Sequence, residues 1–103
     1  MDAEYFKEQI CDELKGAKCY AKKAIELRAM APMWSKMLIE MSAAELEHST
    51  NLYKMFEEYY QKIYESFKDN IPTYLKDIKE EIDEMYTKYG MKVKYLHEMY
   101  NTK

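Results

Sequence analysis

Residues that make turns are scarce in this sequence. It contains 2 Gly and 2 Pro in 103 residues, whereas a compact β fold needs many turns, and turns draw on Gly, Pro, Asn and Asp. A chain with so few breaks folds into a small number of long elements, so all-β and β-α-β architectures are close to excluded. We therefore predict an all-α protein with three long helices.

The two prolines indicate where these helices begin. Pro32 suits the first turn of a helix, where its missing N–H and fixed φ are tolerated, and Pro72 follows a polar stretch that is typical of a turn. Gly90 weakens the third helix without having to end it. The predicted single domain, residues 1–103, consists of helices over about residues 3–29, 33–67 and 72–100.

Charge and hydropathy limit the partners that this chain can have. The net charge of −3 argues against a nucleic-acid partner, because such proteins usually present a basic face. No apolar run has the length of a membrane span or the character of a signal-peptide core, so we expect no membrane partner and a cytoplasmic location. Cys11 and Cys19 lack the spacing of a redox or zinc pair and are expected to be reduced thiols. A group of lysines opposite the apolar side of the first helix is expected to be a solvated face: Lys15, Lys18, Lys22 and Lys23.

Positions spaced three and four residues apart trace the face that each helix should turn to the core. In the third helix this face is apolar throughout, whereas ionisable residues interrupt it in the first two. The predicted faces are Phe6, Ile10, Glu13, Ala17, Tyr20 and Ala24; then Trp34, Leu38, Met41, Glu45, His48, Leu52, Met55, Tyr59 and Ile63; and finally Ile71, Leu75, Ile78, Ile82, Met85, Tyr89, Val93, Leu96 and Tyr100.

The interrupting residues Glu13, Glu45 and His48 indicate a metal site. A carboxylate among apolar side chains is costly unless a counter-charge or a metal compensates it. If the first two helices form a hairpin that turns near residues 30–33, Glu13 lies level with Glu45 and His48. The last two form a Glu-x-x-His pair, whose members project from one helix face. Carboxylates with imidazole suit iron, manganese or zinc.

These residues carry a resemblance to a known family. Glu13 and Tyr20 in DELKGAKCYA, with Glu45 and His48 in AAELEHSTNLYKM, resemble the first half of the ferritin-like superfamily, and rubrerythrin in particular, over about residues 5–60. The resemblance implies a di-iron centre that serves ferrous-iron oxidation, iron storage or peroxide reduction. It also implies that Glu13 is a terminal carboxylate, Glu45 a bridging carboxylate and His48 the imidazole ligand. Tyr20 would hydrogen-bond around the ligands without binding the metal.

The chain departs from the family because half of the usual ligand set is missing. There is no fourth helix and no second Glu-x-x-His pair, since Lys94 stands three residues before His97. Glu84 would lie more than about 10 Å along the bundle from the site and is expected to be solvated. We expect His97 to be a surface or partly buried residue. The role of the third helix is left open.

A second molecule can supply the missing half. Two hairpins related by a two-fold axis form a four-helix bundle with four carboxylates and two imidazoles. The encapsulated ferritins, which are short ferritin-like chains, complete their site in this way. We therefore expect a homodimer or a higher homo-oligomer with the metal centre at its interface.

Three functions follow from this pattern. The first is an iron-binding protein with a di-iron carboxylate site, which would make it an oxidoreductase of the ferroxidase or peroxidase type. No Cys₄ rubredoxin-like module accompanies it in this sequence. The second is a metal-free helical adaptor or assembly protein, in which Glu13 and His48 form an ion pair or hydrogen bond. The third is a zinc-stabilised dimer without redox chemistry.

Overall fold

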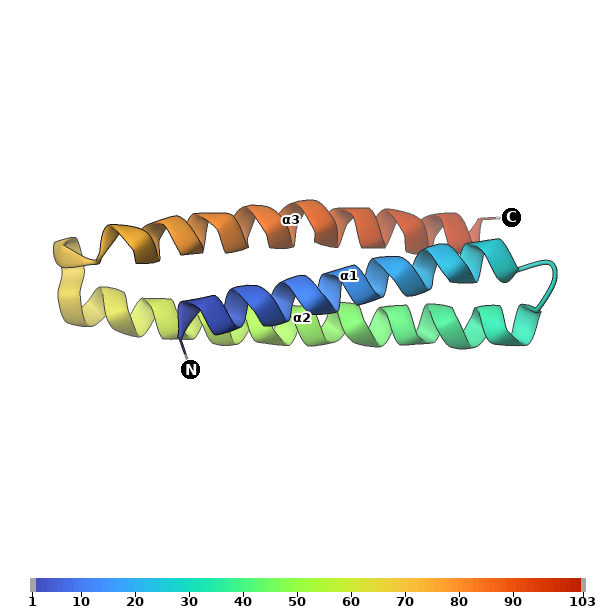
Figure 1. The fold of residues 1–103 in the computed structure, drawn as a ribbon, viewed down its shortest axis with the longest axis horizontal. Helices are drawn as coiled ribbons and strands as arrows, with labels where there is room; N and C mark the ends of the chain where they lie inside the picture. Colours follow the sequence, from blue (N-terminus) through green and yellow to red (C-terminus); the bar gives the residue numbers. More distant parts are fainter. Residues whose placement is uncertain (1, 103) are drawn as a thin grey trace.

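The computed structural model describes residues 2–102, and the chain forms three long helices (Figure 1). They are α1 (Ala3–Leu27), α2 (Pro32–Phe67) and α3 (Thr73–Asn101), and the short 3₁₀ helix η1 (Lys68–Asn70) lies between α2 and α3. No strand occurs among the described residues. The predicted all-α fold with three long helices is confirmed, and each helix end lies within two residues of its expected position.

Local chemistry explains where the helices begin and why the third continues. Asp2 caps α1, because its Oδ1 accepts the backbone N–H of Tyr5 at 2.9 Å. Pro32 is the first residue of α2, as predicted. Helix α3 passes through Gly90 without a break. The glycine therefore lowers the helix propensity of this segment but does not divide it.

The three helices lie nearly side by side in an elongated body of 56 × 20 × 15 Å. Figure 1 shows α1 and α2 as an antiparallel hairpin, with α3 returning along α1 in the same direction as α1. Because α2 is longer than α1, its last turns extend beyond the N-terminus of α1, and η1 reverses the chain there. Helix α1 consequently packs against both of the others.

Two buried hydrogen bonds set the register of α1 against α2. Ser35 Oγ donates to the carbonyl oxygen of Ala24, and Ser42 Oγ donates to that of Ala17. The two residues of each pair are equally distant along the chain from a point between residues 29 and 30. The hairpin therefore turns close to the position expected from Pro32, which brings Glu13 level with the Glu45–His48 turn of α2.

Large apolar side chains form the core at the η1 end of the molecule. The ring of Phe6 lies 5.7 Å from that of Phe56 and 5.5 Å from that of Tyr59, measured between centroids. Burial of these rings is the main stabilising contribution at this end. The buried cluster contains Ala3, Phe6, Ile10, Leu14, Phe56, Ile71, Leu75, Ile78 and Ile82.

At the other end, small residues form the contact between α1 and α2. Ala17, Ala21 and Ala24 pack there against α2, whose fully buried positions are Ser35, Ser42, Ser49 and Phe56, each seven residues from the next. Serine can be buried in this way because its hydroxyl donates to a backbone carbonyl and its size lets two helices approach closely. We call the contact formed by these alanines and serines the small-residue seam.

The seam corrects the predicted core faces of the first two helices. Trp34, Met41 and Met55 were expected in the core, but they are 68%, 43% and 47% exposed. The hydropathy pattern favoured these large residues over the serines beside them. The buried face of α1 is likewise shifted by one residue from the predicted face. Leu14 and Ala21 are buried, whereas the predicted Glu13 and Tyr20 beside them are half-buried. The predicted face of α3 is largely confirmed, although Tyr89 is 40% exposed.

Helix α3 is attached along its whole length, which answers what the third helix does in this fold. Arg28, the only arginine of the chain, donates from one guanidinium nitrogen to the carbonyl oxygens of Met99, Tyr100 and Thr102 at 2.8–3.0 Å. The last carbonyls of a helix have no N–H four residues further along the helix to pair with, and the cation also complements the helix dipole. Nearer the middle of the helix, Lys7 pairs with Glu81 at 2.6 Å.

Candidate metal centre

Glu13, Glu45 and His48 meet at one point of the α1–α2 hairpin. Each offers a carboxylate oxygen or a ring nitrogen, and these three atoms lie within 4.8 Å of one another. Within residues 2–102, no other group of three or more His, Cys, Asp or Glu side chains is gathered in this way. The expectation that these residues come together is confirmed.

The carboxylate of Glu13 has a buried oxygen without a partner. Its side chain is 24% exposed, and no group of the described chain donates a hydrogen bond to Oε2. The nearest cationic group is His48 Nδ1 at 3.5 Å, which is longer than a normal N–H···O hydrogen bond. A buried carboxylate oxygen without a donor is costly. Within residues 2–102, the His48 imidazole at ion-pair distance is therefore the one cationic group beside this oxygen, and no hydrogen bond satisfies it.

Glu45 is held against Glu13, and this proximity changes its acidity. The pKa of Glu45 is raised above the ordinary glutamate value, first because its protonated carboxyl can hydrogen-bond to that of Glu13, then because of burial and the negative charge of Glu13. The charge of His48 acts in the opposite direction. Two carboxylates at this separation cannot both ionise cheaply unless a cation lies between them. A proton or a metal ion would satisfy both.

Gly16 makes room for this arrangement, although the pattern of ionisable residues in the sequence does not point to it. A Cβ atom at Gly16 would lie 3.1 Å from Oε2 of Glu45, closer than most real Cβ contacts. Glycine inside a helix costs about 1 kcal/mol relative to alanine. Gly16 is one of only 2 glycines in the chain, and it stands three residues after Glu13. An unexplained glycine one turn from a candidate ligand was the signal available in the sequence.

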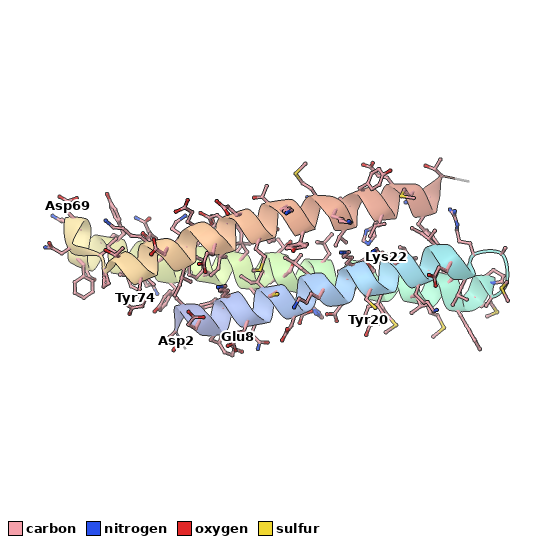
Figure 2. The ribbon with its side chains drawn as sticks, turned by 45° about the horizontal axis from the view of Figure 1, so that its top comes forward. Asp2, Glu8, Tyr20, Lys22, Asp69 and Tyr74 are labelled. Carbon is pink, nitrogen blue, oxygen red and sulfur yellow. The ribbon has the colours of Figure 1, made fainter. Side chains whose placement is uncertain are left out.

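The cluster lies on the side of the hairpin that α3 does not cover. Cys11 lines a cavity together with Met85 and Tyr89 of α3, and it is about 160° around α1 from Glu13. Figure 2 shows Tyr20, seven residues after Glu13, on the side of α1 that faces away from α3. We call this uncovered side the open face; it carries Glu13, Tyr20, Trp34, Met37, Met41, Glu45 and His48.

Apolar side chains line the open face between the cluster and the turn that joins α1 and α2. Trp34 and Met37 are 68% and 61% exposed, and together with Leu38 and Met41 they line a shallow depression on α2. His48 is itself 56% exposed. Exposed apolar residues that gather next to an incomplete set of metal ligands are typical of an interaction surface.

The other residues considered in the sequence lie outside the cluster. Tyr20 is half-buried, and its hydroxyl has no hydrogen bond to the three ligand residues in the described part of the chain. Its role around the ligands stays a prediction. Glu84 is exposed, as expected. His97 is partly buried and lies 2.8 Å from Ser42 Oγ through its Nε2.

The hydrogen bond of His97 shows that its Nε2 carries a proton, and the pKa of the ring indicates its charge. Ser42 gives its single hydroxyl proton to the carbonyl of Ala17, so its oxygen accepts from His97 and Nε2 carries the proton. Burial lowers the pKa of His97. His97 is therefore a neutral donor that attaches α3 to the small-residue seam, and it is separate from the cluster.

Two carboxylates and one imidazole fit iron, manganese or zinc, all of which accept mixed oxygen and nitrogen ligands.

None of the helices between residues 2 and 102 combines the length and the apolar character needed to cross a membrane. A cytoplasmic location stays a prediction. In comparisons with known proteins, the chain matches no family model, no curated protein and no solved structure.

Proposed function

We propose that this protein binds iron through Glu13, Glu45 and His48 and uses it to oxidise ferrous iron or to reduce peroxide. The observation that carries the proposal is the buried Oε2 of Glu13, which accepts no hydrogen bond and lies beside a second carboxylate and an imidazole. Iron bound there would supply the one-electron chemistry of such a reaction. The ferritin-like resemblance of the Glu13, Glu45 and His48 pattern agrees with this assignment.

The residues of the chain have distinct tasks in this proposal. Glu13 and Glu45 hold the cation between them, because a divalent ion removes both the repulsion of the carboxylates and the need for a proton on one of them. His48 adds a neutral nitrogen ligand. Gly16 lets the Glu45 carboxylate approach α1, so it acts by positioning a ligand residue and does not bind the metal.

We further propose that the complete centre forms between two copies of the chain. One hairpin offers three ligand residues, whereas a di-iron carboxylate centre uses four carboxylates and two imidazoles. The open face supports pairing because exposed Trp34, Met37 and Met41 lie beside the ligands on a side of the hairpin without a third helix. A two-fold axis through this face would bring two identical clusters together.

Metal analysis of aerobically purified protein tests the metal assignment. We expect iron, near-ultraviolet absorption from ferric ions, and loss of both in Glu45→Gln. Glu47→Gln is the matched control, because Glu47 is exposed and lies two residues along the same helix. Zinc without near-ultraviolet absorption would identify a zinc-stabilised protein, and protein that binds no metal would support the metal-free adaptor. Either result contradicts the iron proposal.

Light scattering after size exclusion tests the shared centre. We expect a dimer that dissociates in Met37→Glu, while the same change at Met91, which is 66% exposed on α3, leaves it intact. A monomer that retains two iron ions would show that the second copy is not needed.

A further inference from the structure

Two segments far apart in the sequence contain lysine but no acidic residue. Residues 14–25 of α1 carry four lysines and residues 85–97 of α3 carry three, with no Asp or Glu in either segment. The chain has 19 acidic residues, and residues 27–39 and 48–56 also lack them but carry fewer basic side chains. Each segment alone is an ordinary solvated side of a helix.

The fold places the two segments next to each other. Lys7 pairs with Glu81 and Arg28 with Tyr100, so residues of α1 lie level with residues 72 to 74 positions later in α3. This offset aligns Lys18 with Lys92. Figure 2 shows Lys22 on the side of α1 that faces α3, opposite Tyr20. The lysines of this side therefore flank the contact between α1 and α3.

We call this surface the basic face; it consists of Lys15, Lys18, Lys22, Lys88 and Lys92. Lys15 and Lys18 line a cavity of about 170 Å³ whose other walls are Cys11, Leu14, Met85 and Tyr89. Lys88 extends over the ring of Tyr89, with its nitrogen 6.0 Å from the centroid. The basic face thus contains a recess with mainly apolar walls, and Lys15 and Lys18 form its cationic border.

The lysines of the basic face are not paired with carboxylates at salt-bridge distance within residues 2–102, although Lys15 lines a surface depression with Glu8 and Asp12, and Lys88 lines one with Glu84. None of its five lysines takes part in a salt bridge of the described chain, whereas Lys7 and Lys79 each have a carboxylate partner. The pKa of Lys18 is lowered, first by the charge of Lys22, then by that of Lys92, and to a smaller extent by burial. Crowded like charges oppose folding unless an anion relieves them.

The size of the basic face and the charge around it decide which anion fits. Lys15 and Lys22 are about 10 Å apart along α1, which is the length of three to four residues of extended peptide. The whole chain has a net charge of −3, so the rest of it, without these five lysines, carries −8. A long polyanion or an anionic membrane would extend past the basic face and meet this negative surface. A short anionic segment would not.

We propose that the basic face is a docking site for a short acidic segment of a partner protein, with glutamate or aspartate carboxylates on the lysines and an apolar side chain in the recess. The face lies on the opposite side of α1 from the metal cluster. It therefore stays accessible in a dimer formed through the open face, and the proposal does not depend on metal binding.

Fluorescence anisotropy with a labelled peptide of two glutamates, one leucine and two further glutamates tests the proposal. We expect binding that weakens with salt and that falls by at least about tenfold in the double variant Lys18→Glu, Lys92→Glu. The control Lys54→Glu, Lys62→Glu makes the same change in net charge at exposed lysines of α2 and should change the affinity less than about twofold. Circular dichroism verifies that each variant is folded, and Lys18→Gln, Lys92→Gln replaces the first variant if it is not.

Several results would overturn the proposal. Absence of peptide binding, or equal weakening by both double variants, would show that the basic face is not a specific site. Tighter binding of a single-stranded oligonucleotide or of phosphatidylserine vesicles than of the peptide would assign the face to another class of partner. Self-association that Lys18→Glu, Lys92→Glu abolishes would assign it to a second copy of the chain.

Discussion

The two ends of the α1–α2 hairpin are held together by different means. At the η1 end, Phe6 and Phe56 belong to a core of large apolar side chains that all three helices share. At the turn end, Ala17 and Ala24 meet Ser35 and Ser42, and buried hydroxyl groups donate to the carbonyls of the facing helix. The first arrangement buries much apolar surface, and the second brings two helices close together in a defined register.

The candidate metal centre lies where these two arrangements meet. Large residues alone would separate the helices and permit several registers, whereas a hydrogen bond from a small side chain permits one. Ser42 lies one turn before Glu45 and donates to Ala17, which lies one turn after Glu13. The small-residue seam therefore places the two carboxylates, while the apolar core supplies most of the stability.

The largest expected effect comes from the apolar core. Phe56→Ala should lower the free energy of unfolding by about 3–5 kcal/mol, because it removes a fully buried ring and leaves a cavity. Urea denaturation followed by circular dichroism measures this loss. Phe67→Ala, at a residue of the same helix that is 56% exposed, should remain within about 0.5 kcal/mol of the unmodified protein. Equal losses would remove the distinction between core and surface on α2.

The next effect concerns the centre between the two ends. Under anaerobic conditions, Fe²⁺ at about 100 times its Kd should stabilise the protein by about 2.7 kcal/mol. Glu45→Gln should lose this gain, yet be at least as stable without metal, because the amide can donate a hydrogen bond to Glu13 and carries no charge that Glu13 repels. Glu47→Gln should retain the gain. Thermal unfolding with and without Fe²⁺ measures both. A Glu45→Gln variant that is still stabilised by Fe²⁺ would place the metal elsewhere.

Overpacking the small-residue seam should lower the free energy of unfolding less than Phe56→Ala does. It should weaken metal binding more than Phe56→Ala does. Ser42→Leu introduces a large side chain between α1 and α2 and should cost about 1–3 kcal/mol. It should also raise the Kd for Fe²⁺, since it moves Glu13 away from Glu45. Ser66→Leu makes the same exchange at an exposed position of α2 and should change neither quantity. Unchanged metal affinity in Ser42→Leu would show that the seam does not position the ligands.

The smallest effect is the pH dependence of the seam at His97. Burial holds its pKa in the folded chain below the ordinary value of 6.5, so on acidification the unfolded chain takes up the proton first. The contribution of His97 to stability is therefore complete above pH 6.5 and declines as the pH falls below that value. His97→Gln keeps a donor for Ser42 but does not titrate, and should flatten this decline. Identical pH profiles of the two proteins would contradict the assignment of His97 as a neutral donor.

Much of the candidate centre could be predicted because it depends on helix geometry and chain position. The spacing of Glu45 and His48 places them on one side of a helix wherever that helix packs. Pro32 sets the turn, and the turn sets which residues of the two helices lie level. The role of Gly16 could not be predicted in this way, because the space that it leaves is defined only by the position of the Glu45 carboxylate across the seam.

The sequence by itself determined the number of helices, their approximate bounds and the meeting of Glu13 with Glu45 and His48. It did so through three features: the scarcity of glycine and proline, the position of Pro32 and the Glu-x-x-His spacing. Tertiary structure alone decided which neighbouring residues became core. Ser42 is buried and Met41 is exposed because the facing helix offers a carbonyl to the hydroxyl and no space for a larger side chain. The basic face likewise arises only when α3 lies along α1, since nearness between residues 14–25 and 85–97 is a property of packing and not of either helix alone.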